Sequence, residues 1–157
     1  MEGRSDQQLD RQVQREREDE RSIHRLVARY CHAVAEGDVD AWAATWVEDG
    51  EWVVLGRSLR GRAAIVEHYR KLVGPVRWVV QVAQNGLVDV RGDAAEGRWL
   101  ILEWLQWERG GGGQNVGQYR DRYRRGEDGE WRFARRELAG LYFGPPDLSA
   151  DPPRGAT

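Results

Sequence analysis

Glu103 is the side chain in this 157-residue sequence whose type and position best suit chemistry. It lies in the middle of residues 98–108, an apolar run typical of a buried strand. A carboxylate is expensive to desolvate, so this one must either line a cavity or meet a cation. In a cavity, burial would raise its pKa toward neutrality, where it could act as a general acid or base. Side chains alternate along a strand, so its face also carries Trp99, Ile101, Leu105 and Trp107.

Four further polar side chains fall on predicted strands near the one that carries Glu103: Gln81, Asn85, Tyr119 and Asp121. Gln81 and Asn85 share a strand face, so both either project into the cavity or satisfy backbone groups at a bulge. Tyr119 and Asp121 also share a face. Asp121 is interpreted either as a second carboxylate of the site or as the structural partner of an arginine or tyrosine.

Aromatic side chains are the other candidates. Tyr30 lies on the apolar stripe of the first predicted helix, where its hydroxyl needs a partner and could donate to a substrate oxygen. The sequence has eight tryptophans against two phenylalanines, and rigid aromatics in this number suit a pocket or a subunit interface. We predict a slot for a flat or polycyclic molecule, with a wall that includes Trp46, Trp52 and Trp99.

Three helices and a run of strands must position these groups. Apolar spacing predicts a first helix from Ile23 to Gly37 and a second that is capped by Asp38 and carries Trp46. A third helix begins at Gly61 and ends at residues 74–75. The turn Asp49-Gly50 is expected to lead into the first strand. Strands are predicted at residues 51–55, 76–90 (with a break near Asn85-Gly86), 98–108, 117–125 and 130–138.

The predicted order divides the chain into three parts. Residues 1–19 form a charged, helical extension, and residues 20–143 form one α+β domain. Residues 144–157 hold four of the five prolines and are expected to be extended.

Composition excludes several classes of function. The net charge of -2 gives no electrostatic footprint for nucleic acid or an anionic membrane. Cys31 is the only cysteine, which rules out an intrachain disulfide and a cysteine-based zinc site. No two of the three histidines have metal-ligand spacing, so we predict neither a metal nor a cofactor. The sequence has no long apolar stretch, and we expect a cytoplasmic protein without a membrane partner.

Short motifs recur along residues 20–143 in a fixed order: Arg29-Tyr30, Gly37-Asp38, Trp46 followed by Asp49-Gly50, Gly61-Arg62 with Ile65, Asn85, Gly92-Asp93-x-Ala95, Gly117-x-Tyr119-x-Asp121 and Gly129-x-Trp131-x-x-x-x-Arg136. In this order the chain resembles the NTF2-like (SnoaL-like) superfamily. The resemblance implies a cone, with helices against the concave face of a strongly curved, mostly antiparallel sheet. It also implies a small hydrophobic ligand inside the cone and a homodimer formed through the convex face.

The resemblance places Arg136 near the pocket, where it could neutralise a carboxylate or bind an anionic substrate group. Several dehydratase-like relatives use an Asp–His pair as general base, but the matching positions here hold Ala35 and Gln81. We therefore expect a cofactor-independent isomerase, lyase or cyclase that relies on Glu103. The alternative is a protein that binds a hydrophobic small molecule without changing it.

Overall fold

The computed structural model describes residues 2–147, with side chains from Gln7 onward, so most of the predicted proline-rich tail lies outside the described residues. This part of the chain has three helices and six strands: α1 (Glu2–Glu36), α2 (Val39–Ala44), β1 (Trp46–Val54), β2 (Arg57–Arg60), α3 (Arg62–Val73), β3 (Val76–Arg91), β4 (Ala94–Trp107), β5 (Gly112–Arg125) and β6 (Trp131–Gly144).

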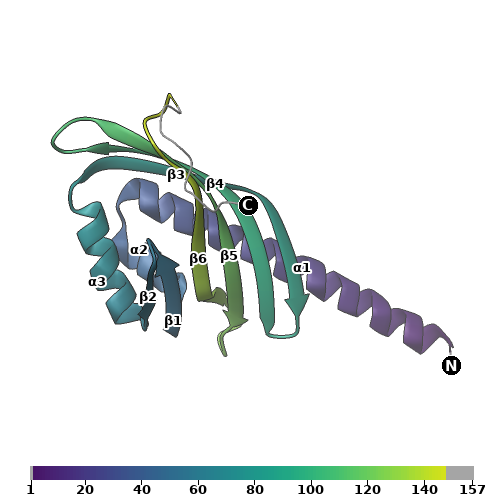
Figure 1. Ribbon diagram of the computed structural model, residues 1–157. Coiled ribbons are helices and arrows are strands. Elements are labelled where there is room, and N and C mark those ends of the chain that lie inside the picture. The colour runs from purple at the N-terminus through teal and green to yellow at the C-terminus, as the bar shows by residue number, and fades with distance from the viewer. Residues whose placement is uncertain (1, 148–157) are drawn as a thin grey trace.

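The strands form one curved, open sheet in the order β2-β1-β6-β5-β4-β3. All neighbours are antiparallel except β1 and β6, which run parallel. The helices lie against the concave face, as Figure 1 shows. The predicted α+β class and cone-like shape are therefore confirmed.

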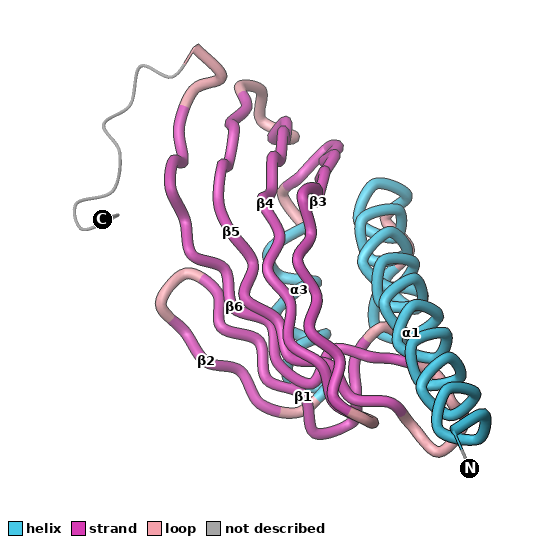
Figure 2. Tube along the Cα trace, turned by 90° about the vertical axis from the view of Figure 1, so that its right-hand side faces the viewer, coloured by secondary structure: helices cyan, strands magenta, loops and turns pink. Residues whose placement is uncertain are grey.

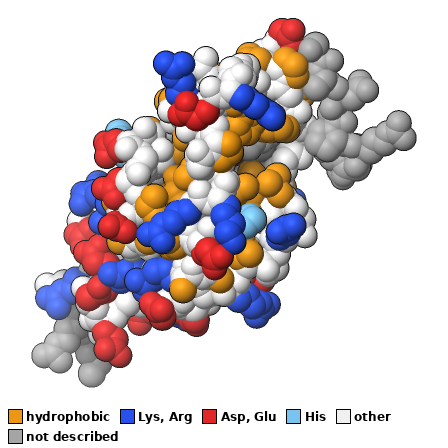
Figure 3. Space-filling view, turned by 90° about the vertical axis from the view of Figure 1, so that its left-hand side faces the viewer, with side chains coloured by type: hydrophobic (Ala, Val, Ile, Leu, Met, Phe, Trp, Pro, Cys, Tyr) orange, Lys and Arg blue, Asp and Glu red, His pale blue; other side chains and the backbone are white. Residues whose placement is uncertain are grey.

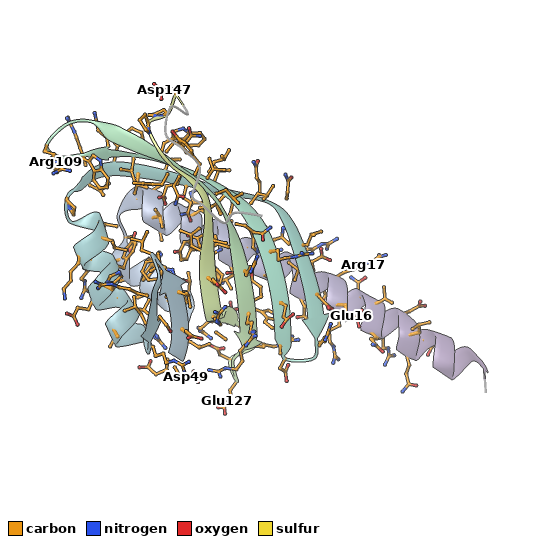
Figure 4. The ribbon with its side chains drawn as sticks, in the orientation of Figure 1. Glu16, Arg17, Asp49, Arg109, Glu127 and Asp147 are labelled. Carbon is orange, nitrogen blue, oxygen red and sulfur yellow. The ribbon has the colours of Figure 1, made fainter. Side chains whose placement is uncertain are left out.

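Helix α1 continues without a break from the predicted extension into the domain. Its N-terminal half projects beyond the sheet, whereas its C-terminal half lies along β3 (Figures 1 and 2). In the projecting half, Glu16 and Arg17 point into solvent (Figure 4). Asp19 is only 6% exposed and accepts hydrogen bonds from Arg125 Nη2 (2.8 Å) and Trp131 Nε1 (3.1 Å), which hold the helix to the β5–β6 hairpin. Within residues 2–147 we find no helix with the length and apolar character needed to cross a membrane.

The apolar stripe predicted for the first helix forms the centre of the core. Each of its members is at most 6% exposed: Ile23, Leu26, Val27, Tyr30 and Val34. The predicted caps are also present. The backbone N–H of Ala41 donates to Asp38 Oδ1 at 2.9 Å, Gly61 precedes α3, and Gly74 follows it.

The first strand differs from the prediction in both its start and its end. Trp46 begins β1 and does not lie in α2, because the helix ends at Ala44 and the hydroxyl of the following residue, Thr45, donates to the carbonyl of Trp42 (2.6 Å). Asp49-Gly50 accordingly lies inside β1 and is not a turn. Leu55 was expected to end the strand but lies in a turn that leads to β2, a strand the sequence did not predict.

The long strands extend further than their patterns indicated. The predicted break in β3 is a β-bulge between Gln84 and Leu87, where Asn85 has a φ of 53°. A β-carbon at Gly86 would lie 2.2 Å from the Trp99 ring, so only glycine leaves room for this tryptophan. The glycines at 112 and 113 belong to β5 and not to a loop.

The two faces of β4 have the predicted alternation. Trp99 and Ile101 are buried on the concave side, at 3% and 1% exposure, whereas Leu100 is 41% exposed on the convex side. Trp78 and Val80 on β3 are also exposed there, at 47% and 43%. Within the single chain, the convex apolar face is thus left partly open to water.

Candidate active site in the concave cavity

A cavity of about 500 Å³ lies between α1, α3 and the concave face of the sheet. Hydrophobic side chains gather on the side of the molecule that Figure 3 shows, which is the left-hand side in Figure 1. The volume is in the range of small-molecule sites. Apolar groups from several elements form most of its wall, among them Val34, Trp52, Leu72, Val79, Leu105 and Trp107.

A row of three polar side chains crosses the sheet inside this cavity. Gln81 on β3 pairs with Glu103 on β4, and Glu103 pairs with Asn115 on β5. Residues that pair across antiparallel strands share a face, so the row is a direct consequence of register. Gln81 Nε2 donates to Glu103 Oε2 at 2.7 Å and to the Tyr119 hydroxyl at 3.1 Å. The amide thereby fixes the orientation of the carboxyl group.

Glu103 has a perturbed environment. Burial raises the pKa of its carboxyl above the ordinary value, while hydrogen bonds to Gln81 and Asn115 act in the opposite direction. The lining residues include no lysine, arginine or histidine among those the structure describes. Glu103 thus lines a cavity and forms no ion pair with the side chains of residues 7–147.

Two phenols border the same row. Tyr30 and Tyr119 are each 2% exposed and line the cavity, with their ring centroids 6.3 Å apart. Burial raises the pKa of both hydroxyls, so they stay protonated and can donate hydrogen bonds at neutral pH.

Arg136 and Asp121 form a buried pair behind the cavity wall. Arg136 Nε and Nη2 donate to the two Asp121 carboxyl oxygens at 3.0 and 3.1 Å, and both side chains are fully buried. The guanidinium also lies over the rings of Tyr30, Tyr119 and Phe133, at 4.3, 3.6 and 4.2 Å from their centroids. Neither member of the pair lines the cavity.

Asp121 has a further partner that ties it to the core. The Tyr123 hydroxyl donates to Asp121 Oδ2 at 2.8 Å and accepts from Trp99 Nε1 at 2.8 Å. Burial raises the pKa of the Asp121 carboxyl, and the charge of Arg136 opposes that shift. This arrangement matches the structural interpretation of Asp121, because the carboxyl is enclosed by protein partners.

The predicted wall residues separate into two groups. Trp52 lines the cavity, whereas Trp46 is fully buried in the core, with its ring 5.7 Å from that of Trp42. Trp99 packs edge-on against His24 with ring centroids 4.7 Å apart, outside the cavity. Asn85 is exposed at the bulge and does not line the cavity, because the extra residue at the bulge ends the alternation that starts at Gln81.

Three polar lining residues, Tyr69, Asn115 and Tyr142, were missed by the sequence prediction. Asn115 shares the alternation of Tyr119, but the predicted strand began at Gly117 and so left it in a loop. Tyr69 lines the cavity from α3, and Tyr142 lines it from β6. Extending the alternation backward from Tyr119 would have found Asn115.

The positions of the relatives' Asp–His pair are empty of titratable groups here. Ala35 is exposed near the end of α1, and Gln81 lies in the polar row. Within residues 2–147, no group of three or more histidine, cysteine, aspartate or glutamate side chains could hold a metal ion. The arrangement offers one carboxyl group of raised pKa beside neutral hydrogen-bond donors, which is suited to proton transfer in an apolar site.

Comparisons with known proteins agree with this fold. The SnoaL-like domain family matches residues 15–137. A variant of Rv3472, a protein of unknown function from Mycobacterium tuberculosis, is 31% identical over 82% of this chain and 75% of its own, with a TM-score of 0.74. An NTF2-like protein with a cystatin-like fold from Novosphingobium aromaticivorans is 34% identical over 82% of this chain and 86% of its own, with a TM-score of 0.69.

A third solved structure carries the name of an enzyme. A candidate scytalone dehydratase from Novosphingobium aromaticivorans is 25% identical over 88% of this chain and 95% of its own, with a TM-score of 0.77. The comparison with curated proteins finds no match. The family match covers most of the sequence, so this chain belongs to the SnoaL-like family of the NTF2-like superfamily.

Proposed function

We propose that this protein is a cofactor-independent enzyme of the isomerase, lyase or cyclase type. Its substrate is a small hydrophobic molecule, cyclic or polycyclic, that binds in the concave cavity. The observation that carries the proposal is Glu103, whose pKa is raised in an apolar wall and whose carboxyl is oriented by Gln81 without a cation. Perturbed titratable groups in cavities are typical of catalytic sites.

In this proposal Glu103 transfers the proton. As a carboxylate it takes a proton from the substrate, and as an acid it returns that proton to another atom or to a leaving hydroxide. Gln81 holds the carboxyl in place through the 2.7 Å hydrogen bond. Tyr30 and Tyr119 donate hydrogen bonds to a substrate oxygen on which charge develops. One positioned acid or base contributes about 10²–10⁴-fold, so the reaction must be an easy proton transfer or elimination.

The named relative supports a reaction of this class. The candidate scytalone dehydratase has a name that refers to an elimination, and it shares the fold at 25% identity. This chain holds Ala35 and Gln81 where dehydratase-like relatives have the catalytic pair. Glu103 therefore takes over the role of the base in this proposal, from the adjacent strand β4.

The second candidate function is binding without catalysis. The loss of both members of the Asp–His pair favours it, because the remaining lining of the cavity is largely apolar. In this alternative Glu103 is a protonated wall residue that donates a hydrogen bond to the ligand.

A mass-spectrometric assay separates the two candidates. Wild-type protein, Glu103→Gln and the control Glu96→Gln are each incubated with a metabolite extract of the organism that carries the gene. Glu96 lies on the same strand but is exposed outside the cavity. If the protein is an enzyme, the wild type and Glu96→Gln consume a compound and Glu103→Gln does not. The product then has the mass of the compound or differs from it by one water. Capture of one compound unchanged by all three proteins would establish the binding function.

We further infer that the protein is a homodimer. The convex face exposes Trp78, Val80 and Leu100 at 41–47%. A second copy packed on these side chains would remove them from water, and apolar patches of this kind mark protein interfaces. The cavity opens on the other side of the sheet, so the dimer leaves it accessible.

A further inference from the structure

The turn between β1 and β2 holds a residue that its geometry disfavours. Val54 pairs with Arg57, so Leu55 and Gly56 form a two-residue hairpin loop. Both have positive φ, 49° at Leu55 and 73° at Gly56, as a type I′ turn requires. The first position of this turn favours Asn, Asp or Gly, because a β-carbon in the left-handed region crowds the following carbonyl oxygen.

Leu55 is also poorly placed for burial within its own chain. Its side chain is 74% exposed, more than any other large hydrophobic side chain of the described residues. An exposed leucine contributes little of the hydrophobic stabilisation that a buried leucine gives to the folded protein. The residue therefore adds backbone strain to the folded protein without a compensating gain in burial.

A further feature of Leu55 is its position at the cavity. Leu55 lines the same cavity as Glu103, and so does Phe143, which is 59% exposed. Side chains that both line a cavity and face solvent lie at its mouth. Gln81 and Tyr119, which are 7% and 2% exposed, lie deep inside. The cavity thus has an apolar mouth and a polar inner end.

We propose that Leu55 is a specificity-determining residue that covers the apolar end of the substrate while the polar end reaches Glu103. The substrate class is an uncharged amphipathic molecule that enters with its oxygen-bearing end first. An anionic end is disfavoured, because the described lining residues offer Glu103 and no basic side chain. The proposal rests on the proposed function only in placing the substrate in this cavity.

The test combines a stability and a binding measurement on the full chain. The probe is N-phenyl-1-naphthylamine, an uncharged apolar dye that is followed by its fluorescence. Leu55→Asn should raise Tm by about 2–4 °C, since it creates the favoured Asn-Gly turn. The same change should raise the Kd of the dye about tenfold, because it removes most of the apolar contact that one leucine makes. Leu55→Met keeps an apolar side chain and should bind like the wild type.

Leu87→Asn is the matched control, since Leu87 is 62% exposed on β3 and lies outside this cavity. It should leave the Kd unchanged. Equal affinity in Leu55→Asn and the wild type would overturn the proposal, and so would equal weakening by Leu87→Asn or a Tm that does not rise. Dye binding needs no turnover. If the wild type binds the dye through Leu55 but converts no compound, the proposed catalytic function is wrong, and the proposed role of Leu55 in binding still holds.

Discussion

Glu103 has the environment of a carboxyl group that is held ready for proton transfer and not locked in an ion pair. Its carboxyl accepts a hydrogen bond from a neutral amide, Gln81 Nε2, at 2.7 Å, and burial raises its pKa. The protonated form is therefore favoured by folding. Such a group stabilises the protein fully below its unfolded pKa, and this contribution is lost as pH rises through the folded pKa.

Glu103→Gln should accordingly unfold at a higher temperature than the wild type at pH 8. The advantage should shrink as pH falls and disappear below the ordinary glutamate pKa, because both side chains are then neutral. A difference of about 1 kcal/mol corresponds to about 2–4 °C in a domain of this size. Thermal unfolding of both proteins from pH 4 to pH 8 measures it. An equal or lower Tm for the variant at pH 8 would show that burial does not disfavour the carboxylate form of Glu103.

Asp121 is expected to differ from Glu103, although burial raises the pKa of both carboxyl groups, because Asp121 has a buried cation as its partner. Asp121→Asn leaves the fully buried Arg136 without its counter-charge, which should cost about 3–5 kcal/mol of unfolding free energy. Replacing both partners by leucine and methionine should restore most of the loss. Denaturant unfolding checks this, with Asp89→Asn in the exposed pair with Arg91 as a control that costs about 1 kcal/mol or less. A stable Asp121→Asn protein without turnover would instead restore the catalytic interpretation.

The bulge in β3 shows how one element positions another. Asn85 takes up the extra residue, and Gly86 lets the Trp99 ring of the neighbouring strand lie directly against the backbone. Gly86→Ala places a β-carbon 2.2 Å from that ring, so either strand or ring must move. Overpacking of this kind typically costs about 1–3 kcal/mol.

We expect Gly86→Ala to lower Tm by about 2–4 °C for each 1 kcal/mol lost. Gly140→Ala is the matched control on β6, because its added β-carbon would meet nothing within 4 Å. Calorimetry of both variants measures the difference. If the two substitutions have the same small effect, the close approach of Trp99 does not constrain the strand.

The helices could be predicted closely from the sequence, and the strand faces could be predicted only in part. The apolar stripe that begins at Ile23 and the caps at Asp38 and Gly61 depend on local spacing, which the sequence shows directly. Trp46 has helical spacing from Trp42, yet the helix ends two residues earlier, at Ala44, and the two side chains reach the core from different elements. Local periodicity does not show where pairing with a neighbouring strand ends a helix and begins a strand.

The candidate site shows the same division. Glu103 was found because it interrupts a long apolar alternation, and Gln81 because it shares the face of its strand. Asn85 was placed on the same face, but a single bulge moved it to the surface. Asn115 was missed because its strand begins five residues earlier than its glycine-rich composition indicated. Bulges and strand ends depend on tertiary packing, and this is where sequence reasoning was incomplete.

In the whole molecule, the concave and convex faces of the sheet differ in what covers them. The concave face forms the cavity, and the parallel pairing of β1 with β6 closes one side of it, an arrangement that no local pattern indicates. The charged residues Asp49, Arg109 and Glu127 lie at the two ends of the sheet (Figure 4). The convex face keeps an apolar centre that a second copy would cover.

Leu100→Glu tests whether a second copy of the chain covers the convex face. The variant should be a monomer at micromolar concentration while the wild type is a dimer, because a carboxylate in the apolar interface is costly to desolvate. Sedimentation velocity distinguishes the two states. Leu9→Glu, on the exposed part of α1, should remain a dimer. A wild-type monomer would contradict the dimer, and a dimeric Leu100→Glu would place the interface elsewhere.

Proton transfer by Glu103 is tested most directly by solvent deuterium exchange into a compound that the protein binds. Wild type and Glu103→Gln are compared in D₂O by mass spectrometry, with the Kd of the compound measured for both. We predict that the wild type exchanges a substrate proton and that Glu103→Gln does so about 10²–10⁴-fold more slowly at nearly unchanged Kd. Equal exchange rates in the two proteins would show that Glu103 is a wall of the cavity and not its acid or base.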